Sequence, residues 1–178
     1  FGTLGAGSRR ERVLDHLQHT FDAEGRVTGI RTVREADGTV RPIRVEALAG
    51  VYGARRDEYI ARAKVVLNVH CNNHDIAPAI FEIVRCSHLF ANKKCVVTED
   101  SGQDQELEVL AARGAVYVPY QKIVSTCLSL VDEMSGGTVD GVKMTAAEAR
   151  RAVAERGYGV IREIDQVEAV RRAIEESL

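Results

Sequence analysis

Hydrophobic residues recur along this chain with two periods, one typical of buried strands and one typical of amphipathic helices. Short apolar runs over 64–70, 94–98 and 115–118 predict strands buried on both faces, as in a parallel sheet. Helical patterns lie around these runs, over 57–63, 78–91, 103–113 and 123–133. The alternation predicts an α/β domain of three layers, with a mostly parallel sheet between helices.

Capping signals predict further helices near both ends of the chain. Ser8 is followed three residues later by Glu11, and Thr145 by Glu148, which is the capping-box spacing. A Gly-Tyr-Gly segment at 157–159 is expected to end the second of these helices, and a Ser-Gly-Gly-Thr segment at 135–138 is expected to be a turn or flexible link. The expected helices cover 8–20, 145–156 and 165–178.

The segment 26–46 interrupts the alternation. Val27, Ile30 and Val33 precede an Asp37-Gly38 pair, and further β-branched residues follow it. Asp-Gly between two β-branched stretches is a strong signal for a hairpin turn. We therefore expect a β-hairpin insertion at about 26–46, with its four interior arginines on a solvated face.

Composition and charge limit the class of protein. The 178 residues fit a single domain, and the net charge of −2 gives no basic excess of the kind that nucleic acid attracts. No apolar run reaches the length of a membrane span, and no leader peptide is visible. The four cysteines form no Cys-x-x-Cys pair, which favours a reducing, cytoplasmic location. Because the chain starts at Phe1 in what reads as the end of a strand, we expect that a segment precedes it.

The first candidate binding loop is glycine-rich. Gly5 and Gly7 allow close approach of a phosphate, and the following helix offers free N–H groups and a positive dipole end. Arg9 and Arg10 oppose that dipole, which is explained if they face an anion. The alternative is a tight turn followed by two solvated arginines.

The second candidate loop follows the run at 64–70 and contains Asn68, His70 and His74. With Cys71, the two histidines could be read as metal ligands, but this loop lacks the helical spacing such a pair needs. We expect no metal. Donors for substrate hydroxyls and phosphate oxygens are the preferred interpretation.

The third candidate region is the helix over 78–91 and the strand after it. Glu82 lies in a largely apolar helix, where an isolated carboxylate would be costly. It is interpreted either as an acceptor for vicinal ribose hydroxyls or as the ion-pair partner of Arg85, three residues on. Glu99 ends the strand.

These residues resemble a known family. The succession Ile60–His70, Phe81–Arg85 and Leu89–Glu99 is similar to the C-terminal domain of GT-B-fold glycosyltransferases, in particular the glycosyltransferase group-1-like proteins of bacterial surface-glycan pathways. Tyr117–Tyr120 and Glu155–Tyr158 also look like family landmarks.

The resemblance implies a Rossmann-like domain that binds a nucleotide-diphosphate sugar as donor substrate, with no separate cofactor. It implies that residues 1–178 are the donor-binding half of a two-domain enzyme, whose N-terminal domain binds a glycan or other acceptor. By this resemblance Glu82 matches the ribose-binding glutamate, and Arg9 and Arg10 match diphosphate-binding residues. Together with the candidate loops above, this gives an expected donor-binding set of Gly5, Gly7, Arg9, Arg10, Asn68, Glu82, Arg85 and Glu99, with His70 and His74 as candidate catalytic residues.

One position departs from the family pattern. Many retaining members carry two glutamates eight residues apart, and the residue eight before Glu82 is His74. A non-catalytic nucleotide- or sugar-binding module therefore stays open as an alternative. An NAD-dependent oxidoreductase is disfavoured, because the glycine turn lacks the Gly-x-Gly-x-x-Gly spacing.

Overall fold

Three parallel strands form the centre of the protein. The computed structural model describes residues 8–46, 48, 51–70, 83–101, 109, 113–139, 141–164 and 175. Strands β5 (Val66–Asn68), β6 (Val96–Glu99) and β7 (Val116–Val118) pair in that spatial order, with β6 in the middle and buried throughout. The three expected strands are confirmed, each end within two residues of its expected position. The fold is mixed α/β.

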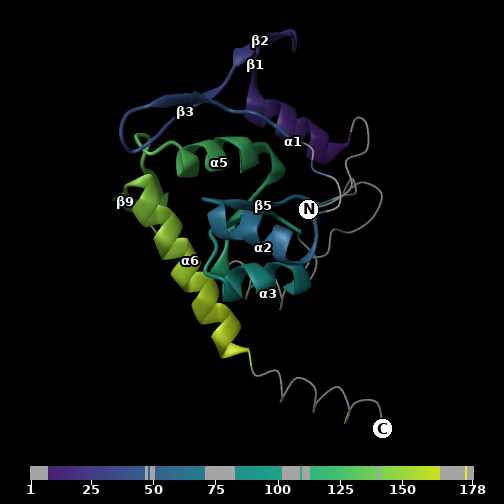
Figure 1. Cartoon of the computed structure of the whole chain (residues 1–178), viewed down its shortest axis with the longest axis vertical. Helices are drawn as coiled ribbons and strands as arrows, with labels where there is room; N and C mark the ends of the chain where they lie inside the picture. The colour runs from purple at the N-terminus through teal and green to yellow at the C-terminus, as the bar shows by residue number, and fades with distance from the viewer. Residues whose placement is uncertain are drawn as a thin grey trace.

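Helices cover both faces of this sheet (Figure 1). Neighbouring residues of β6 point to opposite faces, so Val97 joins one core cluster and Val96 the other. The Val97 cluster includes side chains from α1 (Arg9–Gln18) and α5 (Ile123–Val131). The Val96 cluster includes side chains from α2 (Gly53–Arg62) and α3 (Ile83–Ala91), among them the fully buried Phe90. Burial of one such side chain stabilises the fold by about 1.5–3 kcal/mol.

The long helix α6 (Ala146–Glu163) packs along the edge of both clusters. Its predicted capping box is confirmed: the Thr145 side chain accepts from the Glu148 backbone N–H, and the Glu148 side chain accepts from the Thr145 backbone N–H. The expected end at about 156 was wrong, because the helix continues through Gly157. A Cβ there would lie 2.7 Å from Cδ1 of Phe90 and 2.9 Å from the Gly114 carbonyl oxygen, so glycine is required by close packing.

The segment expected as one hairpin forms two antiparallel ribbons. Helix α1 ends at Gln18, two residues earlier than expected, and β1 (His19–Phe21) pairs with β2 (Val27–Ile30). A second pair, β3 (Thr32–Arg34) with β4 (Val40–Pro42), encloses the predicted turn at Asp37-Gly38. Gly38 has φ +81°, and the Asp37 carboxylate accepts from the Thr39 N–H at 2.8 Å. The prediction missed β1 because a three-residue strand adjoining a helix leaves no periodic signal of its own.

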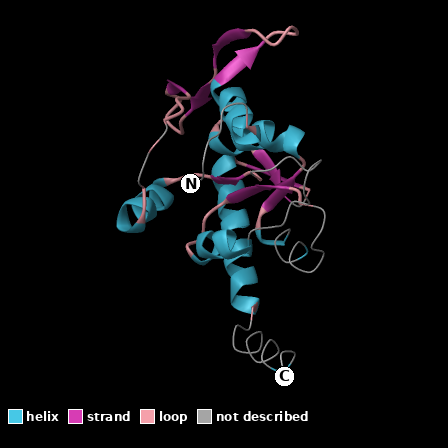
Figure 2. Cartoon of the chain, turned by 90° about the vertical axis from the view of Figure 1, so that its right-hand side faces the viewer, coloured by secondary structure: helices cyan, strands magenta, loops and turns pink. Residues whose placement is uncertain are grey.

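The ribbon β1–β2 projects beyond the helices that cover the sheet, at the top of Figures 1 and 2. The second ribbon is attached to the body by Arg34, whose carbonyl accepts from the Glu133 N–H at 2.9 Å and whose Nε donates to Asp132 at 3.1 Å. Lys64 Nζ donates to Glu35 at 2.7 Å. These contacts hold the ribbon against the C-terminal end of α5 and against Lys64, which lies two residues before β5.

A further hairpin replaces the flexible link expected at 135–138, which was therefore wrong in part. Strand β8 (Gly137–Val139) pairs with β9 (Val142–Met144). Gly136 and Gly141 take positive φ values of +64° and +80°, which lets a short chain reverse. Two expected helices lie largely outside the described residues, those over 103–113 and 165–178. The start of the expected helix over 78–91 also lies outside them. No helix in the described ranges has both the length and the apolar character that crossing a membrane requires.

Candidate functional site

The buried polar residues of the described chain gather at one edge of the sheet. Asn68, His70, Thr98, Glu99 and Ser101 are each less than 10% exposed, and they follow or end β5 and β6. Elsewhere in the described ranges the buried residues are hydrophobic or glycine. Burying a polar group is costly unless it is paired, so this concentration marks a specialised region. It lies at the carboxyl ends of parallel strands, where α/β proteins bind ligands.

Glu99 is the electrostatic centre of this edge. Its side chain is 1% exposed and forms an ion pair with Arg9, which comes from the first residue of α1. The other carboxylate oxygen accepts from the backbone N–H of His70 at 3.1 Å. The sequence predicts that Glu99 contacts a donor substrate. The structure shows that Glu99 holds Arg9 and the end of β5 in place, and the predicted donor contact stays a prediction.

Tyr120 supports Arg9 from the other side. The guanidinium carbon of Arg9 lies 4.0 Å from the centroid of the Tyr120 ring, and the Tyr120 hydroxyl donates to the Arg9 carbonyl at 3.0 Å. Such a cation–π contact contributes about 0.5–1 kcal/mol, and more when it is shielded from water. Tyr120 follows β7, so the third strand of the sheet also contributes to this edge. No chemical role was predicted for it, although it follows a Pro directly after an apolar strand.

Arg10 reaches the same edge. Its Nε donates to the carbonyl of Val69 at 2.9 Å, across 59 residues of sequence. Ser8 caps the helix by accepting from the Glu11 N–H at 3.2 Å, so the first turn of α1 is ordered where the two arginines leave it. In the described part of the chain no carboxylate lies within ion-pair distance of Arg10, whereas Arg9 is paired with Glu99.

Two further contacts stiffen the ends of β5, β6 and β7. The Asn68 side-chain amide donates to the Thr98 hydroxyl at 3.2 Å, which joins β5 to β6. The Ser101 backbone N–H donates to the Tyr117 hydroxyl at 2.8 Å, which joins the end of β6 to β7. The amide nitrogen of Asn68 therefore stabilises the pairing of β5 with β6 at this edge.

The structure therefore brings together five of the predicted site residues: Arg9, Arg10, Asn68, His70 and Glu99. Predictions for Gly5, Gly7, His74 and Glu82 lie outside the described residues, as does the side chain of Arg85. The described five combine two guanidinium groups with a helix N-terminus, an arrangement suited to an anionic ligand.

Metal and thiol chemistry find no support in the described ranges. No group of three or more His, Cys, Asp or Glu side chains there is placed to hold a metal ion. Cys86, Cys95 and Cys127 are buried and form no disulfide. Burial raises the pKa of Cys95 to about 11 and that of Cys127 to about 12, so both behave as small hydrophobic residues.

Comparison with known proteins identifies viral relatives. The chain is 28% identical over 100 residues to uncharacterized protein L138 of Acanthamoeba polyphaga mimivirus. The aligned region covers 56% of this chain and 11% of that protein. It is 30% identical over 91 residues to uncharacterized protein L140 of the same virus, covering 51% of this chain and 29% of that protein. The chain thus spans less than a third of the length of either relative. No protein-family model and no solved structure matches it.

Proposed function

We propose that this chain is the donor-binding half of a glycosyltransferase, and that it binds a nucleotide-diphosphate sugar at the carboxyl ends of β5 and β6. The observation that carries the proposal is the convergence of Arg9 and Arg10 on the edge where the buried polar residues gather. A parallel sheet with helices on both faces is compatible with the Rossmann-like domain that the sequence resemblance implies.

Electrostatics support a diphosphate as the ligand. No described carboxylate pairs with Arg10, and the first turn of α1 adds a positive dipole end. Charge on a departing diphosphate grows in the transition state, and fixed donors aimed at that position would stabilise it. In this proposal Glu99 and Tyr120 are positioning residues, because they hold Arg9 and do not themselves contact the donor.

We expect His70 to contact the sugar or the diphosphate. It lies two residues after the end of β5, is 7% exposed, and has its backbone fixed by Glu99. The acceptor and its binding domain belong to the proposal as expectations from the resemblance. Three buried cysteines that form no disulfide fit a reducing, cytoplasmic setting.

Calorimetric titration with UDP, GDP, ADP and their sugar conjugates tests the proposal. At least one of these ligands should bind, and Arg10→Ala should weaken that binding by about tenfold or more, because an Arg–phosphate contact is worth more than ~1.4 kcal/mol. Arg62→Ala is the matched control, since it removes the same charge from a side chain that is 76% exposed on α2. If no nucleotide binds at millimolar concentration, the proposal fails.

A binding module without turnover is the second candidate. It is favoured by the Arg9–Glu99 pair, which neutralises one of the two cations before any ligand arrives. Hydrolysis of the bound donor separates the two candidates: slow release of free sugar from the best-binding conjugate indicates a catalytic site. Binding without any release over hours, also in the presence of the N-terminal domain, indicates the module.

A further inference from the structure

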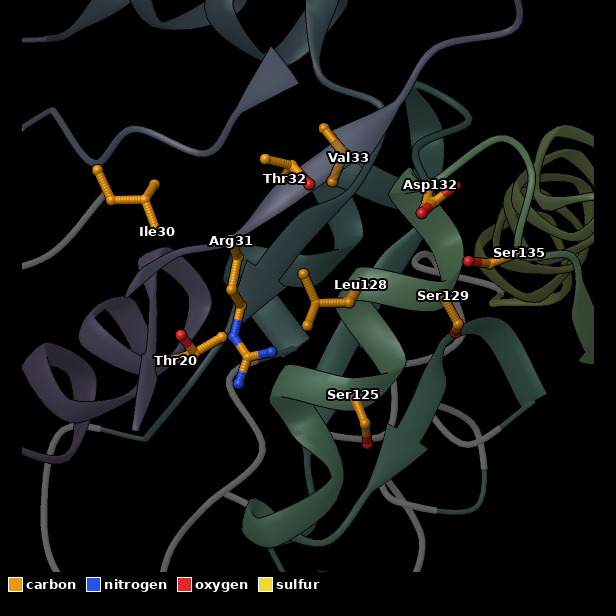
Figure 3. A pocket seen from close by; sticks show the side chains of 10 residues that line it. All are labelled: Thr20, Ile30, Arg31, Thr32, Val33, Ser125, Leu128, Ser129, Asp132 and Ser135. Carbon is orange, nitrogen blue, oxygen red and sulfur yellow. The ribbon is translucent and has the colours of Figure 1, made fainter. Parts of the chain in front are cut away.

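A cavity lies away from the sheet edge. It has a volume of about 550 Å³ and opens between the β-ribbons and the outer face of α5 (Figure 3). Small-molecule sites usually measure about 300–1,000 Å³, so this one is of ligand size. Arg9 and Arg10 start α1, whereas the cavity adjoins the last turn of that helix. A helix of ten residues is about 15 Å long, so the two sites are well separated.

Arg31 is the cation of this cavity. Its Nε donates to the carbonyls of His16 at 2.8 Å and of His19 at 3.0 Å, which fixes the guanidinium at the C-terminal end of α1. Its backbone N–H donates to the Gln18 carbonyl at 2.7 Å. Within the described ranges no carboxylate lies within ion-pair distance of Arg31, and Figure 3 shows its Nη groups directed into the space beside α5. A guanidinium held in this way is a ready partner for an oxyanion.

The wall opposite Arg31 offers hydroxyl acceptors and apolar surface. Ser125 and Ser129 lie one turn apart on α5, and their hydroxyls donate to the carbonyls of Lys122 at 3.0 Å and Thr126 at 2.9 Å. With their protons so used, the two oxygens remain acceptors for ligand hydroxyls. Leu128 lies on the same face of α5 and points into the cavity, as Figure 3 shows.

Among the described lining residues, the one carboxylate is Asp132, and it already has a cationic partner. Asp132 accepts from Arg34 Nε at 3.1 Å through both of its oxygens and from the Met134 N–H at 3.0 Å. Among the described lining residues, Arg31 therefore makes the net charge of the cavity positive. A single inorganic anion would fill only a small part of its volume.

We propose that this cavity binds a small hydroxylated organic acid, with its carboxylate or phosphate group on Arg31 and its hydroxyls on Ser125 and Ser129. The carbon skeleton packs against Leu128. This site does not depend on donor binding at the sheet edge, and neither proposal requires the other.

Backbone amide resonances measured during titration with glucose 6-phosphate, glucuronate and glucose test the assignment. The two acids represent the phosphate and carboxylate forms of the ligand, and glucose is the neutral control. At least one acid should shift the amides of Arg31 and Ser125 in a saturable way, and glucose should not. Shifts confined to Val69 and His70 would assign the acids to the sheet edge and overturn the proposal, as would equal shifts with glucose or none with either acid.

Two variants of one residue separate charge from structure. Ser125→Asp places a negative charge opposite Arg31 and should weaken binding of the acid by about tenfold or more. The same change lies in the first turn of α5, where an acidic residue favours the helix, so the protein should remain folded. Ser125→Asn removes the same hydroxyl without adding charge, so it should weaken binding less than Ser125→Asp does. Arg41→Gln is the matched control, since it removes a β4 arginine that is 67% exposed. Unchanged affinity in Ser125→Asp, or an equal loss in Arg41→Gln, would refute the site.

Discussion

Among the described residues, the buried carboxylate of Glu99 is the one ion-pair partner of the Arg9 guanidinium, and this makes Glu99→Gln the most informative substitution at the residue scale. Glutamine keeps the shape and can still accept from His70, but it removes this negative partner from Arg9, whose side chain is 17% exposed. We expect a loss of roughly 1–3 kcal/mol in the free energy of unfolding, the cost of leaving a buried group unsatisfied.

Urea unfolding at neutral pH measures this loss. Glu155→Gln is the matched control, because that carboxylate is 54% exposed and pairs with Lys93 on the surface. Its effect should stay within about 0.5 kcal/mol. Equal stability of the two variants would show that the Arg9–Glu99 pair contributes no more than a surface pair.

The buried thiols give a second prediction at this scale. Burial raises the pKa of Cys95 to about 11 and that of Cys127 to about 12, from an ordinary value of 9.0. Their thiolate fraction at pH 7 should therefore be lower by roughly a hundredfold or more, since each pKa unit is a factor of ten. In a Cys71→Ser variant, a thiol reagent should label the native protein slowly and the urea-unfolded protein fast. Fast labelling of two or more thiols under native conditions would contradict this burial.

Part of the candidate site was visible in the sequence at the scale of single residues. Arg9, Asn68, His70 and Glu99 were predicted because each starts, ends or follows an element at the carboxyl side of the sheet, and such positions converge by topology. The function of Tyr120 was not predictable, because stacking on a guanidinium across 111 residues depends on tertiary packing and leaves no local pattern.

At the scale of elements, the path of α6 depends on one glycine. Gly157→Ala places a methyl group against Phe90 and the Gly114 backbone, and overpacking of this kind costs about 1–3 kcal/mol. Gly159→Ala, two residues on in the same helix, has no atom within 4 Å of the new Cβ and should gain up to about 1 kcal/mol from helix propensity. Thermal unfolding of the two variants should therefore move in opposite directions. A stabilised Gly157→Ala protein would mean that α6 does not pack this closely.

The same glycine explains an error of sequence interpretation. Glycine at 157 and 159 has poor helix propensity, and local rules place a helix end there. Packing against Phe90 outweighs that local preference. The strands of the sheet were predicted more reliably, because β-branched runs buried on both faces are distinctive in sequence.

At the scale of the whole molecule, a charge network joins three parts of the chain. Glu133 pairs with Arg150 at 2.7 Å and with Lys64 at 3.1 Å, and Lys64 also pairs with Glu35 of the ribbon segment. Partial burial tends to raise the pKa of Glu133, but the hydrogen bonds and charges of Arg150 and Lys64 outweigh it and lower that pKa below 4.5. A lowered pKa stabilises the folded state above the unfolded-state value and ceases to do so as pH falls through the folded-state value.

We therefore expect the free energy of unfolding to fall as the pH is lowered from about 5 to about 3, and Glu133→Gln to flatten this decrease. Urea titrations at a series of pH values measure both effects. Glu155→Gln should keep the wild-type slope, since that residue lies outside the network. If the stability of Glu133→Gln depends on pH as that of the wild type does, Glu133 does not cause the acid sensitivity.

The two ribbons β1–β2 and β3–β4 each have only two strands, and Val27, Ile30 and Val40 on them are more than half exposed. The central strand β6, by contrast, is paired on both sides and fully buried. Amide hydrogens in the ribbons should accordingly exchange with solvent through local opening, at a free energy well below that of global unfolding, whereas those of β6 should exchange only when the whole domain opens. The parallel sheet thus unfolds as one cooperative unit, whereas the two ribbons can unfold and refold locally while the sheet stays intact.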